Sequence, residues 1–312
     1  MTDQSDPDNS KVDVRVYFWS VGHMKRILVV GATGGLGRFV VQELRKKGYW
    51  IRVFSRSITK LKVISGLFDD SVLGDMLDPK SIELVVSGID AVISCAGASM
   101  NLKDFREKRT FEEINFQGNL NILDAAVKAK VSKFVYTSFL RVDGIQEAEY
   151  IKSHDRFSQA VKESGIDYAI VRPTAFFSLL LEFLTLAKKG IGFVIGNGKP
   201  KINPIHEKDV AKAVVEALEG DLKEINIGGP DIFTRDEITE LALRTCGKKK
   251  KPLHIPVFLN RILIQLIRPF NQRVFQFMQF GNIVHTLDII GPQYGTLKLE
   301  DYYKEELNSR EL

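Results

Sequence analysis

The sequence predicts an α/β protein, with a doubly wound parallel sheet followed by a smaller, mostly helical C-terminal cap. From Arg26 to about residue 230, short and wholly apolar runs alternate with longer stretches of helical periodicity. Wholly apolar strands separated by helices are typical of a parallel sheet that is covered on both faces. Beyond this region the alternation stops, and after Gly247 the chain becomes basic and then rich in aliphatic and aromatic residues.

The expected elements follow one another in strand–helix units. The apolar runs predicted as strands are 27–30, 51–54, 90–95, 133–137, 168–171 and 224–227. The stretches predicted as helices are 36–47, 111–129, 150–163, 176–188, 208–218 and 257–268. A glycine-rich stretch at 190–200 is expected to form a hairpin.

Length and composition exclude several classes of protein. The 312 residues are 44% hydrophobic and 27% charged, as in globular rather than disordered chains. No apolar run reaches the roughly 18 residues that a membrane-spanning helix needs. Cys95 and Cys246 form neither a disulfide framework nor a zinc motif, so we expect a reducing, cytoplasmic location and no metal. The net charge of +5 is too small to indicate nucleic-acid binding.

A glycine-rich loop joins the first predicted strand to the first helix. The residues expected at a bound pyrophosphate are Gly31, Thr33, Gly34, Gly35, Leu36 and Gly37. Gly31 permits the tight turn, Gly34 lets the backbone approach the phosphates, and Gly37 lets the helix pack closely. The N-terminus of the helix offers free N–H groups and a partial positive charge. Strand, loop and helix together predict a Rossmann-type, dinucleotide-binding fold.

The residues after the second strand are expected to select the cofactor. NAD-specific sites place Asp or Glu there to hold the ribose hydroxyls. Here Arg56 follows the strand, with Ser57 and Lys60 close behind it. Because a guanidinium binds a phosphate through two parallel hydrogen bonds, we expect NADP, held by Arg56 and Lys60, with NAD as the alternative. The competing interpretation is that Arg56 is an ordinary surface residue.

Several motifs resemble one known family. They are GATGGLG at 31–37, GDMLD at 74–78, NFQGN at 115–119, FVYTS at 134–138, SGIDY at 164–168, and NPIH at 203–206. This set resembles the atypical, extended-type short-chain dehydrogenases, above all their NmrA-like branch, over roughly residues 25–230. The resemblance implies NAD(P)H binding, with Asp75 and Met76 beside the adenine. It also implies that Cys95, Ala96 and Gly97 line the ribose and the pyrophosphate.

The expected domain organisation follows from these motifs. Residues 1–23 are polar and acidic and are expected to be a disordered leader, with 14–19 as a candidate additional strand. The NAD(P)-binding domain is expected over 24–230, with 173–205 contributing to the substrate side. The cap and substrate region is expected over 231–312. Within these parts, His206 is expected to cap the helix that carries Asp209, and 294–302 to pack back on the body.

The catalytic set of the family is incomplete in this chain. Short-chain dehydrogenases use a Tyr as acid or base, a Lys four residues later that lowers its pKa, and a Ser. The candidates here are Tyr150 and Ser138, but His154 stands at the Lys position. Lys152 lies on another face of the helix. If His154 supplied the charge as imidazolium, a rate that depends on Tyr150 would decline as the pH rises through ~6.5.

Three interpretations of this site stay open. Tyr150 could act with His154, or hydride could go to an activated double bond with another proton donor. The third is a non-catalytic NADP(H) sensor or assembly factor that binds a protein partner. Taken together, the two enzyme interpretations make an NADPH-dependent oxidoreductase acting on an apolar small molecule the leading prediction.

The C-terminal tail combines a basic run with an amphipathic helix. Lys248–Lys251 precede the predicted helix 257–268. Its apolar side holds Leu259, Ile262, Leu263, Leu266 and Ile267. Its polar side holds Asn260, Arg261, Gln265 and Arg268. We favour a cap helix that buries its apolar face over the substrate pocket. A membrane-surface helix and a subunit interface are the less favoured alternatives.

Overall fold

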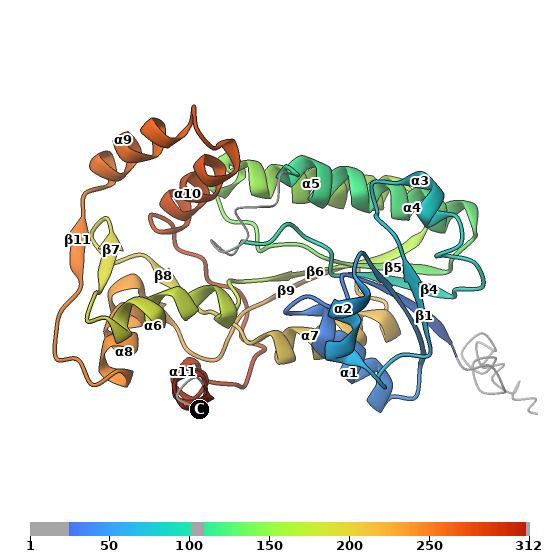
Figure 1. Ribbon diagram of the computed structural model, residues 1–312, viewed down its shortest axis with the longest axis horizontal. Helices are drawn as coiled ribbons and strands as arrows, with labels where there is room; N and C mark the ends of the chain where they lie inside the picture. Colours follow the sequence, from blue (N-terminus) through green and yellow to red (C-terminus); the bar gives the residue numbers. More distant parts are fainter. Residues whose placement is uncertain (1–24, 101–108, 310–312) are drawn as a thin grey trace, which may run out of the picture.

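A seven-stranded, wholly parallel sheet forms the centre of the computed structural model (Figure 1). The structure describes residues 25–100 and 109–309, so the predicted leader and its candidate strand lie outside the described residues. The strand order is β3-β2-β1-β4-β5-β6-β9. The strands are β1 (Arg26–Val30), β2 (Trp50–Ser55), β3 (Asp70–Leu73), β4 (Ala91–Ser94), β5 (Lys133–Thr137), β6 (Asp167–Pro173) and β9 (Glu224–Ile227). The doubly wound α/β fold is as the sequence predicts.

Helices cover both faces of this sheet. Helices α1 (Gly37–Lys46), α2 (Ile58–Leu61) and α7 (Glu207–Glu219) pack on one face, and α3 (Pro79–Ile82), α4 (Asn119–Lys128) and α5 (Glu149–Glu163) on the other. Successive strand side chains point to opposite faces, so Ile27 and Val29 join the first core and Leu28 and Val30 the second. This double burial explains why the central strands are apolar without alternation.

Some elements differ from those predicted. The short edge strand β3 was not predicted because only alternate residues are partly buried. The helix expected over 111–129 begins as a π-helical segment, Glu112–Gly118, and continues as α4. The hairpin expected at 190–200 is wrong: β7 (Phe193–Ile195) pairs in parallel with β11 (Leu253–Ile255). Strand β8 (Lys201–Ile202) pairs with β10 (Phe233–Thr234). Glycines indicate turns locally, but the pairing partners come from distant parts of the chain.

The C-terminal cap is mostly helical, as predicted. It contains α8 (Arg235–Thr245), α9 (Val257–Ile267), α10 (Gln272–Val284) and α11 (Leu299–Ser309). Helices α8, α10 and α11 pack with the 3-10 segment Phe177–Leu180 and α6 (Leu181–Lys188) around a third core, and α9 packs on α10. Asp209 on α7 accepts hydrogen bonds from the N–H groups of Thr296 and Leu297, at 2.9 and 3.0 Å. The closing segment therefore packs back on the sheet domain, as expected.

Helix α9 is oriented opposite to the prediction. Its inward side carries Asn260 and Ile264, and Asn260 Nδ2 donates to Asn282 Oδ1 of α10 at 3.0 Å. Its apolar residues are exposed instead: Phe258, Leu259, Ile262, Leu263 and Leu266. The hydrogen bond to Asn282 satisfies the amide that this orientation buries. Within the described residues, no helix is both long and apolar enough to cross a membrane.

Candidate functional site

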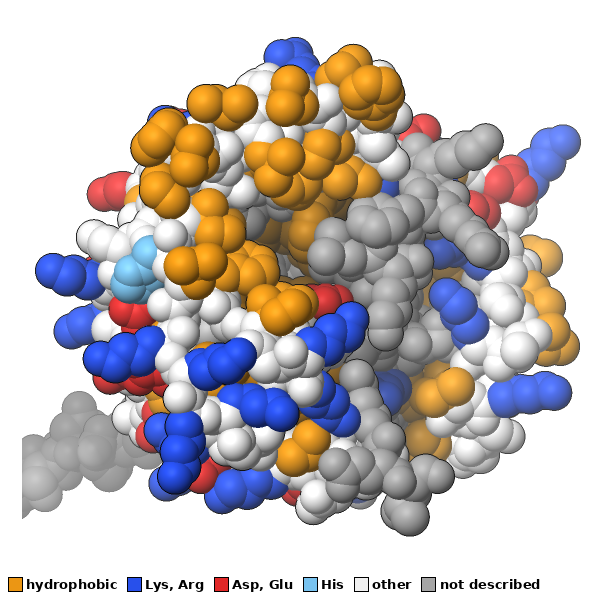
Figure 2. Space-filling view, turned by 60° about the vertical axis from the view of Figure 1, so that its left-hand side comes forward, with side chains coloured by type: hydrophobic (Ala, Val, Ile, Leu, Met, Phe, Trp, Pro, Cys, Tyr) orange, Lys and Arg blue, Asp and Glu red, His pale blue; other side chains and the backbone are white. Residues whose placement is uncertain are grey.

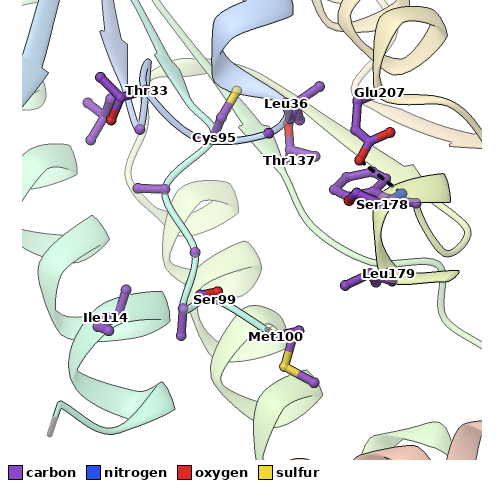
Figure 3. A pocket seen from close by; sticks show the side chains of 18 of the residues that line it. Thr33, Leu36, Cys95, Ser99, Met100, Ile114, Thr137, Ser178, Leu179 and Glu207 are labelled. Atoms are coloured by element: carbon purple, nitrogen blue, oxygen red, sulfur yellow. Dashed lines mark hydrogen bonds between the residues drawn. The ribbon is translucent and has the colours of Figure 1, made fainter. Parts of the chain in front are cut away.

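A cavity of about 750 Å³ lies at the carboxyl edge of the sheet (Figure 3). Residues at or just beyond the ends of β1, β4, β5 and β6 line it, among them Gly31, Cys95, Thr137 and Thr174. Ligands of doubly wound sheets bind at this edge, where the strand order reverses. The cavity continues to an apolar wall formed by Met100, Phe139, Leu179, Leu181 and Phe280. One cavity thus has room for a dinucleotide and an adjoining small molecule.

The phosphate loop meets its steric requirements at two glycines. Gly31 has a φ of +79°, and a Cβ there would lie 2.8 Å from the backbone of Cys95 and Ala96. A Cβ on Gly37 would lie 2.1 Å from the carbonyl oxygen of Gly31. No side chain caps the N-terminus of α1 among the described residues, although the N–H groups of Arg38 and Phe39 donate to the carbonyls of Gly34 and Leu36. The positive end of the helix dipole favours an anion at this loop. This loop forms the cradle that a pyrophosphate requires.

The rim after β2 is basic. Arg56, Ser57 and Lys60 line the cavity there. The carboxylates that line the cavity, Glu182 and Glu207, come from α6 and α7 on its other side. Among the described residues, therefore, no carboxylate lines the rim that follows β2.

Of the two residues expected at the adenine, only Met76 lines the cavity. A Cβ on Gly118 would lie 2.6 Å from Met76 Cγ, so this glycine leaves room for the methionine. Asp75 lies just outside the lining. Its carboxylate accepts from Arg109 Nη1 at 2.9 Å and from the N–H of Leu77 at 3.0 Å. The turn at 75–77 is therefore held by its own carboxylate.

Buried polar side chains brace the backbone of 95–98, which lines the cavity. Asn119 Nδ2 donates to the carbonyl of Ala96, and Asn115 Oδ1 accepts from the N–H of Ala98, at 3.1 and 2.6 Å. Both amides are fully buried. The sequence analysis assigned these two residues no role. Two Asn residues within an apolar helical stripe could have indicated buried side chains that hold nearby backbone. Cys95 packs here as well, and burial raises the pKa of its thiol to about 12, so it is not a reactive thiolate.

His154 projects from α5 into the cavity as a neutral imidazole. It is 4% exposed, and burial lowers its pKa to about 3. Its Nδ1 is 2.5 Å from the hydroxyl of Tyr136, and its Nε2 has no hydrogen-bond partner among the described residues. If the buried Tyr136 hydroxyl donates to Nδ1, the proton of His154 is on Nε2. That atom lies 3.9 Å from where a Cβ of Gly97 would be, facing the predicted ribose site.

This environment argues against the interpretation in which His154 supplies the charge as an imidazolium. A fully buried cation without a counter-charge is unfavourable, so the imidazole of His154 stays neutral well below pH 6.5. Lys152 offers no substitute, because its exposed ammonium is paired with Glu149 at 2.6 Å. His154 therefore cannot supply the fixed charge of the missing lysine.

Tyr150 and Ser138 lie in the same cavity as His154. The ring of Tyr150 packs against His154 at 4.7 Å and Phe280 at 5.1 Å between centroids. Burial raises the pKa of Tyr150 to about 12, so its phenol is neutral. Ser138 Oγ accepts a long hydrogen bond from Ser158 at 3.4 Å. The three candidates are thus brought together, and none of them is charged.

Glu207 was missed by the sequence analysis. It is 3% exposed at the start of α7 and accepts from the N–H of Ser178 at 3.3 Å (Figure 3). Burial raises the pKa of this carboxyl group, which lies 3.9 Å from where a Cβ of Gly35 would be. The preceding residue, His206, accepts from the N–H of Lys208 at 2.9 Å and caps α7 as predicted. A carboxylate directly after the NPIH motif was the available signal.

Comparison with known proteins gives the family. Residues 31–221 match the sequence model of a family described as NAD(P)H-binding. The chain belongs to this family. The glycine cradle, the two cations of the rim and the unpartnered Nε2 of His154 fit such a cofactor. In the described part of the chain, no group of three or more His, Cys, Asp or Glu residues is placed to hold a metal.

Relatives within the family differ in function. The chain is 24% identical to the photosystem II assembly factor Ycf39 of Trieres chinensis, over 88% of each chain. It is 28% identical to the chloroplastic divinyl chlorophyllide a 8-vinyl-reductase of Arabidopsis thaliana, over 90% of this chain and 74% of that one. The NADPH-dependent quinone oxidoreductase QOR2 of Escherichia coli has the same fold, with a TM-score of 0.71 at 17% identity. The superposition covers 90% of this chain and the whole of the QOR2 chain.

Proposed function

We propose that this protein is an NADPH-dependent oxidoreductase that reduces an apolar, electron-poor small molecule such as a quinone or a conjugated alkene. The observation that carries the proposal is the continuity of the cavity, which runs from the phosphate loop past His154 to the apolar wall. A walled, apolar chamber beside the cofactor is what a small-molecule substrate requires. An open, flat cofactor face would instead favour a regulator.

In this proposal, three parts of the site hold the 2′-phosphate, the pyrophosphate and a ribose of the cofactor. Arg56 and Lys60 hold the 2′-phosphate, which favours NADP over NAD. The phosphate loop and the N-terminus of α1 bind the pyrophosphate. Neutral His154 donates from Nε2 to a ribose hydroxyl, so it takes over the positioning role of the missing lysine but not its charge. When bound, NADPH supplies a hydride.

The burial of Tyr150 and the neutrality of His154 favour one substrate class. Reduction of a ketone creates an alkoxide, a strong base that needs a well-matched acid in the site. Tyr150 is a poor donor, because burial raises its pKa to about 12 and the residue at the lysine position, His154, is neutral. A quinone that accepts a hydride becomes a hydroquinone anion, which is aromatic and a much weaker base. It takes its second proton from water, so two electrons and two protons are accounted for without Tyr150. A conjugated alkene that accepts a hydride at its terminal carbon becomes a delocalised carbanion, which takes its proton from water at the neighbouring carbon.

The second candidate is a non-catalytic NADP(H)-binding regulator or assembly factor with a protein partner. Neutral His154 at the lysine position favours it, since the ordinary catalytic set is incomplete. A relative named as an assembly factor supports it too. For either function we propose a cytoplasmic location, in keeping with the two free thiols.

Substrate turnover distinguishes the candidates. NADPH oxidation is followed with quinones, conjugated alkenes, ketones and aldehydes, on the native chain, Tyr150→Phe and Leu179→Trp. We expect turnover with quinones or conjugated alkenes only, retained in Tyr150→Phe. It should be lost in Leu179→Trp, which fills the chamber, while NADPH binding persists. Leu84→Trp, at a side chain that is 72% exposed, is the matched control and should behave like the native chain.

Two results decide against the proposal. Binding of NADPH without turnover of any acceptor would establish the regulator instead. Rapid ketone reduction that disappears in Tyr150→Phe would show that Tyr150 is a conventional acid after all.

A further inference from the structure

Helix α9 exposes a continuous apolar face to solvent. Phe258, Ile262 and Leu266 are 63%, 56% and 64% exposed. Leu259 and Leu263 are about half exposed beside them, and Phe270, after the helix, is 88% exposed. We call these six residues the α9 face; apolar side chains gather at the top of Figure 2, over this part of the molecule. Single exposed apolar residues are ordinary on a protein surface, but a contiguous patch of this kind marks an interaction site.

Packing among the residues that the structure describes does not account for this face. The helix contacts the rest of the cap through its other side, where Ile264 is buried and Asn260 bonds to Asn282. At 100° per residue, the five helical members of the α9 face span an arc of about 140° directed away from that contact. Figure 1 shows α9 at the outer corner of the molecule, beside α10. A convex ridge of this kind fits a deformable apolar medium.

The segment of the chain that carries the α9 face is basic. From Lys248 to Leu287 the chain carries four Lys and three Arg and no Asp or Glu. Lys248–Lys251 are all exposed, as are Arg261 and Arg268, which flank the apolar arc on one side of the helix. Basic side chains also gather below the apolar patch in Figure 2. Such a surface is complementary to a uniformly anionic one, and two copies would bring cations against cations.

We propose that the α9 face docks on an anionic lipid bilayer. The 11 residues of α9 are far shorter than a spanning helix, so the helix lies in the plane of the interface. Its aliphatic side chains and Phe270 enter the acyl boundary, Arg261 and Arg268 remain at the headgroups, and the lysine run adds attraction at longer range. This reverses the preference for a buried cap helix that the sequence favoured.

The docked orientation bears on the proposed function. Helix α9 packs on α10, and α10 lines the cavity through Arg273 and Phe280. An apolar substrate dissolved in the bilayer would then reach the chamber from the membrane side. This consequence rests on the proposed oxidoreductase function, whereas bilayer binding itself does not.

Vesicle flotation of the full chain tests the proposal. Vesicles of phosphatidylcholine alone are compared with vesicles containing phosphatidylglycerol as well. We expect flotation with the anionic vesicles that weakens at roughly 0.5 M salt, where charges are screened within a few ångströms. Ile262→Ser/Leu266→Ser should lower the vesicle affinity at least roughly tenfold, because each substitution removes the favourable free energy of moving an apolar side chain from water into the bilayer. The control is Leu84→Ser/Leu222→Ser, at residues 72% and 69% exposed elsewhere, which should bind like the native chain.

A second pair of variants tests the charge. Lys249→Glu/Lys251→Glu should weaken binding to anionic vesicles about tenfold or more, since each juxtamembrane cation contributes about one kcal/mol. Lys80→Glu/Lys128→Glu makes the same change at exposed sites on α3 and α4 and should have little effect. NADPH affinity should be equal in all these chains, which shows that they are folded and keeps the result independent of catalysis.

Other outcomes overturn the proposal. Equal flotation of the Ile262→Ser/Leu266→Ser chain would show that the α9 face is not the contact. Absence of flotation with both kinds of vesicle would refute bilayer docking. If the native chain then sedimented as a dimer and this variant as a monomer, the face would be a contact between two copies.

Discussion

The neutral, buried state of His154 predicts that the protein loses stability in mild acid. Burial lowers the pKa of His154 from about 6.5 to about 3. Between these values the unfolded chain binds a proton at this residue and the native chain does not. The free energy of unfolding therefore rises with pH in this range, and stability that is fully present above pH 6.5 is lost as the pH falls toward 3.

The magnitude follows from the unfolded pKa alone. As the pH falls from 7 to 5, the protonated fraction of this residue in the unfolded chain rises from about one quarter to nearly one. Integrated over the two pH units at 1.36 kcal/mol per bound proton, this is worth about 2 kcal/mol. The result does not depend on the native pKa as long as that value stays well below 5. His206 and His285, whose pKa values burial also lowers, to about 4, add to the total acid sensitivity. The contribution of His154 to the acid sensitivity is therefore measured by comparing the native chain with a variant that lacks this histidine.

Urea unfolding at pH 7, 6 and 5 measures this difference. In His154→Gln the free energy of unfolding should fall by about 2 kcal/mol less between pH 7 and pH 5 than in the native chain. Tyr136→Phe is the control: it removes the hydroxyl that bonds His154 and should cost about 1–3 kcal/mol, by the same amount at each pH. Equal pH dependence of His154→Gln and the native chain would refute the assignment of a neutral, buried imidazole.

Three further substitutions test the cofactor site and its supports. Arg56→Ala should weaken NADPH binding roughly 10–150-fold and leave NADH binding unchanged, as calorimetric titration would show; equal effects on both cofactors would contradict a 2′-phosphate contact. Gly37→Ala puts a Cβ 2.1 Å from a carbonyl of the phosphate loop. It should abolish NADPH binding in the same assay and lower the free energy of unfolding by about 1–3 kcal/mol. Asn203→Ala removes three bonds to loop backbone and should cost about 2–4 kcal/mol in urea unfolding, whereas the exposed Asn308→Ala should cost almost nothing.

Sequence reasoning succeeded where the determining interactions are local. The phosphate loop was predictable because Gly31 and Gly37 stand at a fixed spacing between an apolar strand and a helix. At each position a side chain would clash with nearby backbone atoms, so only glycine fits. The central strands were predictable because burial on both faces leaves them apolar throughout. The cap of α7 by His206 was predictable for the same reason, since its partner is two residues away.

Tertiary structure decided what depends on partners distant in the sequence. The pairing of β7 with β11 joins strands some 60 residues apart, which no local turn signal reveals. The buried role of Glu207 depends on Ser178 and the phosphate loop meeting it from other parts of the chain.

The charge of His154 and the direction of the α9 face show the same division most clearly. The sequence determined that a histidine stands at the lysine position and that 257–268 is an amphipathic helix. Only the burial of His154 in the folded chain made that residue a neutral imidazole, because the cost of charging a group depends on the water removed from around it. Likewise, the amphipathic pattern shows that α9 has two sides but not which one faces inward. Which side packs inward depends on the surface that meets the helix, and here Asn260 and Ile264 face inward, where Asn282 of α10 satisfies the buried amide of Asn260.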